Sequence, residues 1–347
     1  MVKRHGNLWE KVITEENIRL AYELSRKGKG RKYNVRKFNR NLEENLKIVR
    51  EKLINKTFTT ANYSTKTVFE PKKRVIYILP FNPDRIIQHA VMNVIIPIWE
   101  RLFIHDSYAC REGKGMHVGS LKTMEFIRNN KYCLKCDISK FYPSINHEIL
   151  KKIIRRKIKD PDVLWLLDDI IDSFPGKTNT PIGNFTSQWF GNLYMNELDQ
   201  YVKHELKVKC YLRYCDDFCF FHNDKKTLNE IASKIKQFTA EKLELKLSKC
   251  DLFPVSRGVD FLGYRHFPEY ILLRKSTAKR AKKRIKKAII ALQNHRMTAD
   301  QFRSTIASYQ GWMKWARTYN LRLKLDIDRL IEVSKDAKRA DDILARL

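Results

Sequence analysis

The spacing of apolar residues predicts that the chain begins with helices. Residues 14–28 are expected to form the first helix, with Thr14 as its N-cap and Gly28 at its end. Apolar residues recur at helical spacing over 38–53, which predicts a second helix. A basic loop over residues 28–32 would separate the two helices.

The middle of the chain alternates between strand-like and helical patterns. Residues 57–80 are rich in Thr, Val, Ile and Tyr, which predicts extended structure. Residues 82–84 are expected to open a helix that is apolar almost all round and therefore buried. The order of elements indicates an α+β fold that ends in a basic helical segment. The remaining predicted elements are strands near 132–138 and 210–221, a β-hairpin near 258–273, and helices near 146–158, 184–206 and 226–243.

Composition indicates a folded chain with a polyanionic partner. The 347 residues include 69 Lys and Arg against 39 Asp and Glu, which gives a formal net charge of +30. The hydrophobic fraction of 43% can bury a core and excludes global disorder. The length suggests two or three domains. The cationic excess favours nucleic acid as the partner, and an anionic membrane surface is the competing interpretation.

Targeting signals and cysteines suggest a compartment. No run of about 18 apolar residues could form a transmembrane helix. The polar residues that follow Met1 do not form the apolar core of a signal peptide. The seven cysteines are an odd number without a framework spacing, which is typical of reduced thiols. We therefore expect a cytoplasmic protein that binds no membrane.

Paired aspartates occur at 168–169, 216–217 and 341–342, and one pair stands out. Asp216-Asp217 lies between two apolar strand-like runs, so both carboxylates would sit near the tip of a hairpin, where their repulsion needs cations. Divalent metal ions are the usual solution in phosphoryl transfer, although an ordinary acidic turn has the same residues. Asp137 ends another strand-like run, and beside Asp216 it would complete an oxygen site suited to Mg²⁺.

These aspartates lie in motifs that resemble those of reverse transcriptases. Asp137 with Tyr142 five positions later resembles motif A, and residues 214–217 resemble motif C. Chance similarity does not explain the further blocks, which follow in the family's order. They resemble three finger motifs, motif D and the primer-grip hairpin, at residues 74–80, 84–90, 107–115, 247–249 and 261–264.

One block narrows the resemblance to a branch of that family. At the motif B position most reverse transcriptases have Gln-Gly-x-x-x-Ser-Pro, whereas this chain has Ile182-Gly183-x-x-x-Ser187-Gln188. Both changes resemble the reverse transcriptases of diversity-generating retroelements, which copy a template repeat into cDNA with errors at template adenines. Isoleucine can only pack where glutamine would form hydrogen bonds, so discrimination among nucleotides should loosen. The alternative interpretation of Ile182 is a plain core residue.

The resemblance implies a right-hand polymerase fold. Residues 1–130 would form the fingers with an N-terminal helical extension. Residues 131–265 would form a ferredoxin-like palm with an antiparallel sheet, and a fingers insertion would lie near 160–210. Residues 266–347 would form a helical, basic thumb.

The resemblance also assigns a metal site and catalytic residues. Asp137 and Asp216 would bind two Mg²⁺ ions together with the backbone carbonyl of Ile138. Asp217 would tune the site and contribute to metal binding. Lys249 would protonate the leaving pyrophosphate, unless it is a solvated lysine at a strand end.

Nucleotide and nucleic-acid contacts follow from the same resemblance. Tyr142 would reject a ribose 2′-hydroxyl unless it is a core aromatic, and Arg85 could instead form a structural ion pair. The full set of expected nucleotide contacts is Arg74, Arg85, Tyr142, Ile182, Gly183 and Gln188, with Lys72 and Lys73 as auxiliaries. The primer grip would consist of Phe261, Leu262, Gly263 and Tyr264. The duplex backbone would be bound by Arg274, Lys275, Lys279, Arg280, Lys283 and Arg284.

The implied partners are structured template RNA, a cDNA/RNA duplex, deoxynucleoside triphosphates and an oligomeric, basic accessory variability protein. Three alternatives remain open: a retron- or intron-type reverse transcriptase, an RNA-dependent RNA polymerase, and a non-catalytic nucleic-acid-binding scaffold. Ile182 and Gln188 argue against the first, Tyr142 against the second, and the intact Asp137 and Asp216 against the third.

Overall fold

The computed structural model describes residues 4–69, 73–335, 337 and 339–346, so the auxiliary candidate Lys72 lies outside it. The chain divides into two compact units. The first comprises Met1–Gly113, Lys135–Phe218 and Asn229–Cys250. The second comprises Lys114–Leu134, Cys219–Leu228 and Asp251–Leu347. No helix in the described ranges is both long and apolar enough to cross a membrane.

The N-terminal helices agree with the apolar spacing, with two differences, since a short helix over Trp9–Val12 was not predicted and one predicted helix is divided. Thr14 caps its helix as expected, because its hydroxyl accepts a hydrogen bond from the backbone N–H of Asn17 (3.1 Å). The helix predicted over 38–53 is divided in two, since Asn41 leaves the helical conformation (φ −128°, ψ 58°). The four helices are α1 (Trp9–Val12), α2 (Glu15–Arg26), α3 (Tyr33–Asn39) and α4 (Leu42–Ile54).

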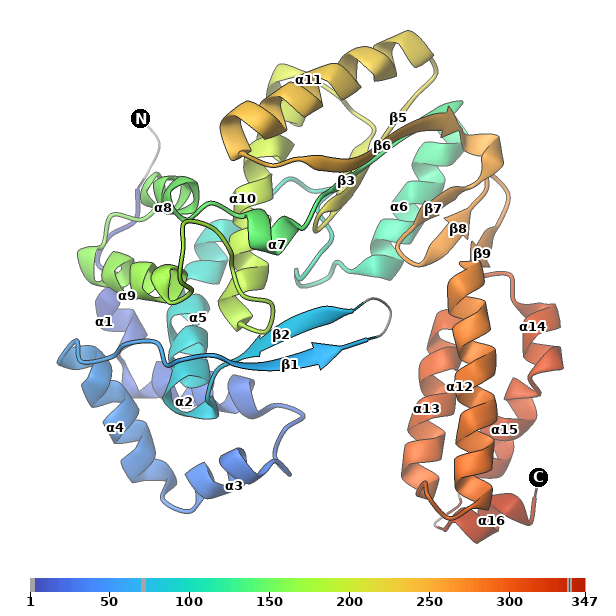
Figure 1. Cartoon of the computed structure of the whole chain (residues 1–347), viewed down its shortest axis with the longest axis horizontal. Coiled ribbons are helices and arrows are strands. Elements are labelled where there is room, and N and C mark those ends of the chain that lie inside the picture. Colours follow the sequence, from blue (N-terminus) through green and yellow to red (C-terminus); the bar gives the residue numbers. More distant parts are fainter. Residues whose placement is uncertain (1–3, 70–72, 336, 338, 347) are drawn as a thin grey trace. The chain divides into compact units, whose positions relative to one another are not determined.

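The segment predicted to be extended over 57–80 forms a β-hairpin, and the predicted buried helix follows it. Strands β1 (Ser64–Val68) and β2 (Arg74–Ile78) pair antiparallel, with Ser64 opposite Ile78 (Figure 1). A short kinked segment, η1 (Phe81–Arg85), in which Asn82 is not helical (φ −114°, ψ 127°), leads into α5 (Ile86–Glu100), which is buried on most of its surface. Packing all round α5 explains why its apolar residues show no polar face.

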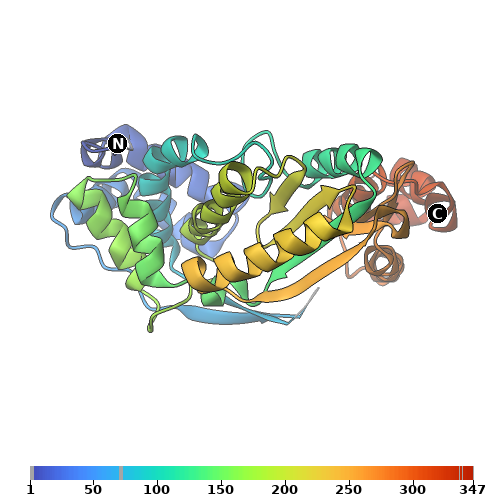
Figure 2. The same cartoon turned by 90° about the horizontal axis from the view of Figure 1, so that it is seen from above.

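The central sheet has four strands in the order β4-β5-β3-β6. Strand β3 occupies the residues predicted for it, and α11 runs along the sheet in both views (Figures 1 and 2). The helix predicted near 184–206 forms α10 and continues as a π-helical turn, η2. The elements of this region are α6 (Met116–Asn129), β3 (Tyr132–Ile138), α7 (Phe141–Ser144), α8 (His147–Arg155), α9 (Pro161–Asp172), α10 (Phe185–Gln200), η2 (Tyr201–Glu205), β4 (Tyr211–Tyr214), β5 (Asp217–His222), α11 (Lys225–Leu243) and β6 (Leu247–Pro254).

The C-terminal part contains a small sheet and a helical bundle. The hairpin predicted over 258–273 gains a third strand, because Phe267 donates a backbone hydrogen bond to Tyr270 (2.9 Å) and the chain turns back there. Apolar residues from α12, α13 and α15 form the bundle's core, which includes Ile285, Phe302 and Leu330. The elements are η3 (Val255–Arg257), β7 (Val259–Phe261), β8 (Tyr264–His266), β9 (Ile271–Leu273), α12 (Lys275–Gln293), α13 (Ala299–Met313), α14 (Tyr319–Lys324), α15 (Ile327–Ser334) and α16 (Ala340–Leu344).

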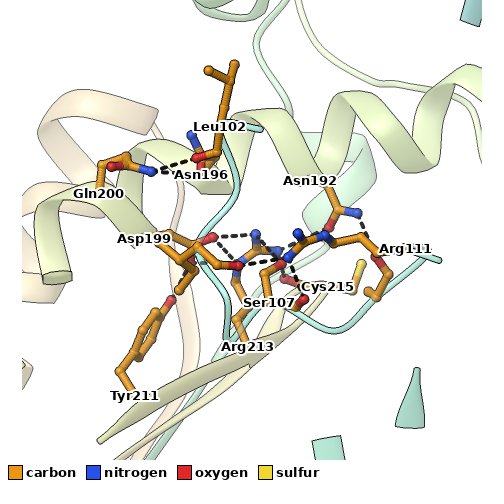
Figure 3. Close-up of polar contacts among 12 residues, drawn as sticks. Leu102, Ser107, Arg111, Asn192, Asn196, Asp199, Gln200, Tyr211, Arg213 and Cys215 are labelled. Carbon is orange, nitrogen blue, oxygen red and sulfur yellow. Dashed lines mark hydrogen bonds and ion pairs between the residues drawn. The ribbon is translucent and has the colours of Figure 1, made fainter. Parts of the chain in front are cut away.

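A buried ion pair joins β4 to α10 (Figure 3). The side chains of Arg213 and Asp199 are both 0% exposed, and Arg213 Nη2 lies 2.6 Å from Asp199 Oδ2. Tyr211 donates a second hydrogen bond to the same carboxylate (2.7 Å). Burial alone would lower the pKa of Arg213, but the neighbouring Asp199 charge outweighs it and raises that pKa above its ordinary value.

Arg213 also reaches the turn that follows β4. Its Nη1 donates to the backbone carbonyl of Cys215 (3.0 Å) and to the side-chain oxygen of Asn192 on α10 (3.3 Å). Its Nη2 donates to the hydroxyl of Ser107 (3.1 Å). One guanidinium therefore fixes α10, the loop at Ser107 and the backbone just before Asp216.

We predict that Asp199→Asn destabilises the protein by about 3–5 kcal/mol, because it leaves the Arg213 charge buried without a counter-ion. Urea denaturation followed by circular dichroism measures the change. The exposed pair Arg19–Glu43 provides the control, and Glu43→Gln should cost about 1 kcal/mol or less. Equal losses in the two variants would contradict the interpretation.

Candidate active site

Two aspartates meet where the central strands β3 and β5 lie side by side. Asp137 is the penultimate residue of β3, and Asp216 lies in the short turn between β4 and β5. The backbone N–H of Ile138 donates a hydrogen bond to the carbonyl of Asp216 (3.2 Å), which ties the two segments together. Cys215 adopts positive φ (+59°), a conformation that is uncommon outside glycine and that strained functional turns often contain.

The charges around Asp216 match a site built for cations. Burial raises the pKa of Asp216, and the nearby charge of Asp137 raises it further. The positive charge of Arg74 acts in the opposite direction and lowers the same pKa. The structure therefore brings the predicted pair Asp137 and Asp216 together, with Arg74 of β2 close enough to act on Asp216.

Asp217 has a partner that sequence patterns did not indicate. Lys135, two residues before Asp137 on β3, places its Nζ 3.1 Å from Asp217 Oδ2. The other oxygen, Oδ1, is buried and accepts no hydrogen bond within the described structure. Burial raises the pKa of Asp217 to about 6, although Lys135 opposes that rise. Asp217 is thus a buried carboxylate with one oxygen neutralised and one oxygen unpaired.

Ser248 is a second residue that sequence patterns did not single out. Its hydroxyl lies 2.6 Å from Asp137 Oδ2 and 3.1 Å from the backbone oxygen of Asp137. Side chains alternate along a strand, so the predicted general acid Lys249 projects from the opposite face of β6, where it is exposed. Only the adjacency of β3 and β6 reveals the Ser248 contact.

The carboxylates fit Mg²⁺ in a site that substrate would complete. In the described residues, no group of three or more His, Cys, Asp or Glu side chains is arranged to hold a metal ion. Mg²⁺ in polymerase sites typically takes one or two carboxylates plus substrate phosphates and water. Asp137 and Asp216 match this donor set. Asp217, whose Oδ1 is unpaired, directly follows Asp216 in the sequence.

The predicted gate Tyr142 lies beside the same turn. Its hydroxyl is 3.4 Å from the Cys215 sulfur, and its ring is half-buried next to Phe141. Burial raises the pKa of Tyr142 far above its ordinary value, so the phenol stays protonated at neutral pH. Tyr142 therefore has features of a core aromatic, because it packs on Phe141. It also has a feature of a gate against the ribose 2′-hydroxyl, because its hydroxyl faces the residue before Asp216.

The motif B segment is held by backbone contacts to β2. Tyr77 donates a backbone hydrogen bond to the carbonyl of Ile182 (2.8 Å). Gly183 has φ +131°, and a Cβ there would lie 2.0 Å from the Tyr77 carbonyl oxygen, so only glycine fits. Arg85 donates to the Gly183 carbonyl (3.0 Å), which supports this loop rather than leaving Arg85 entirely for substrate. Gln188 is exposed on α10.

The primer-grip block forms a tight turn between β7 and β8. Leu262 and Gly263 both have positive φ (+55° and +84°), the signature of a type I′ hairpin. Phe261 and Tyr264 are fully buried, and a Cβ on Gly263 would lie 2.6 Å from the Trp312 ring. The side chains of this block therefore build the small sheet, and the turn backbone is what it offers to a ligand.

The predicted backbone-binding cations lie mostly on the exposed face of α12. The buried residues Ala281, Ile285, Ala288 and Leu292 define the inner face of the helix. Arg274, at the N-cap, is paired with Asp260 (Nε to Oδ1, 2.6 Å) and so is already neutralised. The other members of the set lie on the helix itself: Lys275, Lys279, Arg280, Lys283 and Arg284.

Comparison with known proteins connects this geometry to other chains. The first relative is protein YkfC of Escherichia coli strain K12, 25% identical over 236 residues, which cover 54% of this chain and 61% of YkfC. The group II intron-encoded protein LtrA of Lactococcus lactis subsp. cremoris is 29% identical over 141 residues, 38% of this chain and 23% of LtrA. Nuclear intron maturase 4, mitochondrial, of Arabidopsis thaliana is 23% identical over 210 residues, 56% and 25% of the two chains.

These alignments cover less than two thirds of each relative's length. A family model described as reverse transcriptase (RNA-dependent DNA polymerase) matches residues 54–266. The match contains Asp137, Asp216, Asp217 and the motif B segment. Because it covers more than half of the 347 residues, the chain belongs to the reverse transcriptase (RNA-dependent DNA polymerase) family.

Proposed function

We propose that the protein is an RNA-directed DNA polymerase that joins deoxynucleotides by two-metal nucleotidyl transfer. The observation that carries this proposal is that Asp137 and Asp216 lie close together at the ends of the adjacent strands β3 and β5. A backbone hydrogen bond between Ile138 and Asp216 holds them there. Membership of the reverse transcriptase family supports it. Two Mg²⁺ ions would supply Lewis-acid stabilisation of the attacking and leaving oxygens.

The chain's own residues orient these reactants. Asp137 and Asp216 would hold the ions, with help from the Ile138 carbonyl, and Ser248 would fix the rotamer of Asp137. Arg74 would neutralise triphosphate charge, since it already acts on Asp216 across the site. Tyr142 would close the pocket against a ribose 2′-hydroxyl. Lys249 as the acid for pyrophosphate stays a prediction, since strand alternation turns it away from the Ser248 face.

The domain layout belongs to the same proposal. Residues 1–130 would act as fingers, 131–265 as the palm with an insertion near 160–210, and 266–347 as the thumb. The antiparallel small sheet and the basic helix α12 support the assignments of primer grip and backbone binding. A cytoplasmic location stays a prediction.

We further propose the mutagenic branch of the family, in which errors fall at template adenines. The support is the motif B segment: Ile182 places a half-buried apolar side chain where a glutamine could form hydrogen bonds. Gly183 keeps that segment against β2, so Ile182 is presented from a rigid loop. Structured template RNA and an oligomeric, basic accessory protein would be the partners.

The names of the relatives favour a second candidate. An intron-encoded protein and an intron maturase both align with this chain, which supports an intron-type enzyme that copies RNA without targeted errors. The two candidates share the Asp137–Asp216 site and differ in fidelity. Fidelity is therefore the property that separates them.

We predict that Asp216→Asn lowers DNA synthesis on an RNA template by about a thousandfold or more, because it removes a charged ligand of the transferring metal. Primer extension with Mg²⁺ measures the rate. Asp168→Asn is the control, since Asp168 pairs with Arg155 in an ordinary surface contact. DNA synthesis that survives Asp216→Asn would point to the scaffold alternative.

We predict that Ser248→Ala lowers kcat by about tenfold and raises the Mg²⁺ concentration needed for half-maximal rate, because Asp137 loses a charge-assisted hydrogen bond. Ser248→Thr should restore both values, since it keeps the hydroxyl. Ser233→Ala, in which an α11 hydroxyl bonded to Asn229 is lost, is the matched control. An unchanged Mg²⁺ requirement in Ser248→Ala would contradict the positioning role.

We predict that cDNA made with cognate RNA and partner carries errors concentrated at template adenines. Ile182→Gln should lower that error rate about fivefold, because glutamine restores a hydrogen bond worth about 1 kcal/mol. Ile182→Val keeps an apolar side chain and serves as the control. Sequencing of the cDNA gives the counts by template base. Uniform, low error rates in the wild-type cDNA would favour the intron-type candidate.

A further inference from the structure

A groove in the C-terminal unit lies outside every site described above. It has a volume of about 580 Å³ and is lined by residues of β9, the first turns of α12 and the start of α14. That volume is typical of pockets that hold small organic ligands. It is lined by Tyr270, Leu272, Leu273, Ala278, Lys282, Arg317, Thr318, Tyr319, Asn320 and Leu321.

The charged side chains that line the groove are all positive. Lys282 and Arg317 line it, and its lining includes no carboxylate. Both cations are exposed, and in the described structure neither side chain forms an ion pair. Arg317 is fixed at its backbone, since its N–H donates to the carbonyl of Ile271 (2.7 Å). Two cationic side chains that line one groove favour an anionic ligand.

The groove also exposes aromatic rings. Tyr319 is 72% exposed, and Tyr270 is 36% exposed and stacks on Phe267 (ring centroids 4.8 Å apart). Leu272 and Leu273 also line the groove and add apolar surface. Exposed rings beside cations are the features with which proteins bind unpaired nucleotides, because bases stack on the rings while phosphates meet the cations.

A duplex does not match these features as well. Bases in a duplex are stacked on one another, so their faces are not available to Tyr319 and Tyr270. An acidic protein would satisfy Lys282 and Arg317 but would leave the exposed rings unexplained. The rings and the cations together favour a single-stranded segment.

We propose that this groove binds unpaired nucleotides of RNA, with a base stacked on Tyr319 and phosphates bound by Lys282 and Arg317. The choice of RNA rests on the proposed function, in which the chain works on a structured RNA. The groove would anchor a single-stranded part of that RNA on the C-terminal unit. Its Lys282 lies on α12 next to Lys283, one of the predicted duplex contacts, so the groove adjoins that set.

The first test uses the full-length protein and a 12-nucleotide oligouridine that carries 4-thiouridine. Ultraviolet cross-linking followed by mass spectrometry should place cross-links on residues 270 and 317–321. A blunt RNA duplex with the same label should give none there. Cross-links only at other residues, or equal cross-linking of the duplex, would overturn the proposal.

Binding measured by fluorescence anisotropy gives the second test. Tyr319→Ala should weaken oligouridine binding about tenfold, because stacking contributes about 1–3 kcal/mol per base. Tyr319→Phe should retain binding, since it keeps the ring. Tyr33→Ala is the matched control, because Tyr33 is 70% exposed beside the basic loop of the other unit. Equal binding by wild type and Tyr319→Ala would overturn the proposal.

Salt dependence tests the cations. Lys282→Gln with Arg317→Gln should reduce the slope of log affinity against log salt by about 1.4, because each phosphate contact to a single strand contributes about 0.7. An unchanged slope, or a polyglutamate peptide that displaces oligouridine from the groove, would argue for a protein partner and against the proposal. These readouts need no DNA synthesis, so a failure here is distinguishable from a failure of the polymerase assignment.

Discussion

The buried pair of Arg213 and Asp199 is the interaction on which the active-site turn depends. Burying this pair costs a large desolvation free energy, because two charges leave water. Only near-complete hydrogen bonding of both groups offsets that free energy. The guanidinium meets that condition with Asp199, Asn192, Ser107 and the carbonyl of Cys215. The backbone of Arg213 adds two more bonds, to Asp106 and from Tyr108 (both 2.9 Å). The backbone at Arg213, three residues before Asp216, is therefore held in place by these hydrogen bonds.

The carboxylates beyond that point are the groups that the proposed function assigns to metal binding. Asp137 is held by Ser248 and Asp217 by Lys135, while burial disfavours the charge on Asp216 and Asp217. Such a cluster is poorly neutralised by the protein alone. In the proposed function, metal ions carried with a triphosphate would relieve it, and the site would then couple its own electrostatic balance to the presence of substrate.

Local patterns predicted the elements that depend on nearby residues, but they missed α1, α6 and α9. Strand β3, the cap at Thr14 and the buried helix α5 follow from spacing and turn chemistry. The family was also predicted from ordered motifs, and the family match confirms it. The contacts of Ser248 and Lys135 could not be predicted in this way. They require the pairing of strands more than a hundred residues apart in one case and the burial of Asp217 in the other. The predicted residue roles stay predictions.

Gly183 has a consequence for protein engineering. The carbonyl of Tyr77 occupies the space of any side chain at position 183, so that position admits no variation without moving β2. Ile182, the adjacent residue, accepts a hydrogen bond from the same tyrosine through its backbone carbonyl, and that bond does not depend on its side chain. A library that seeks altered copying accuracy can therefore randomise position 182 on a loop whose shape is inherited from its glycine neighbour. In such a library, position 182 would be the residue that varies, and Gly183 would keep the loop in its shape.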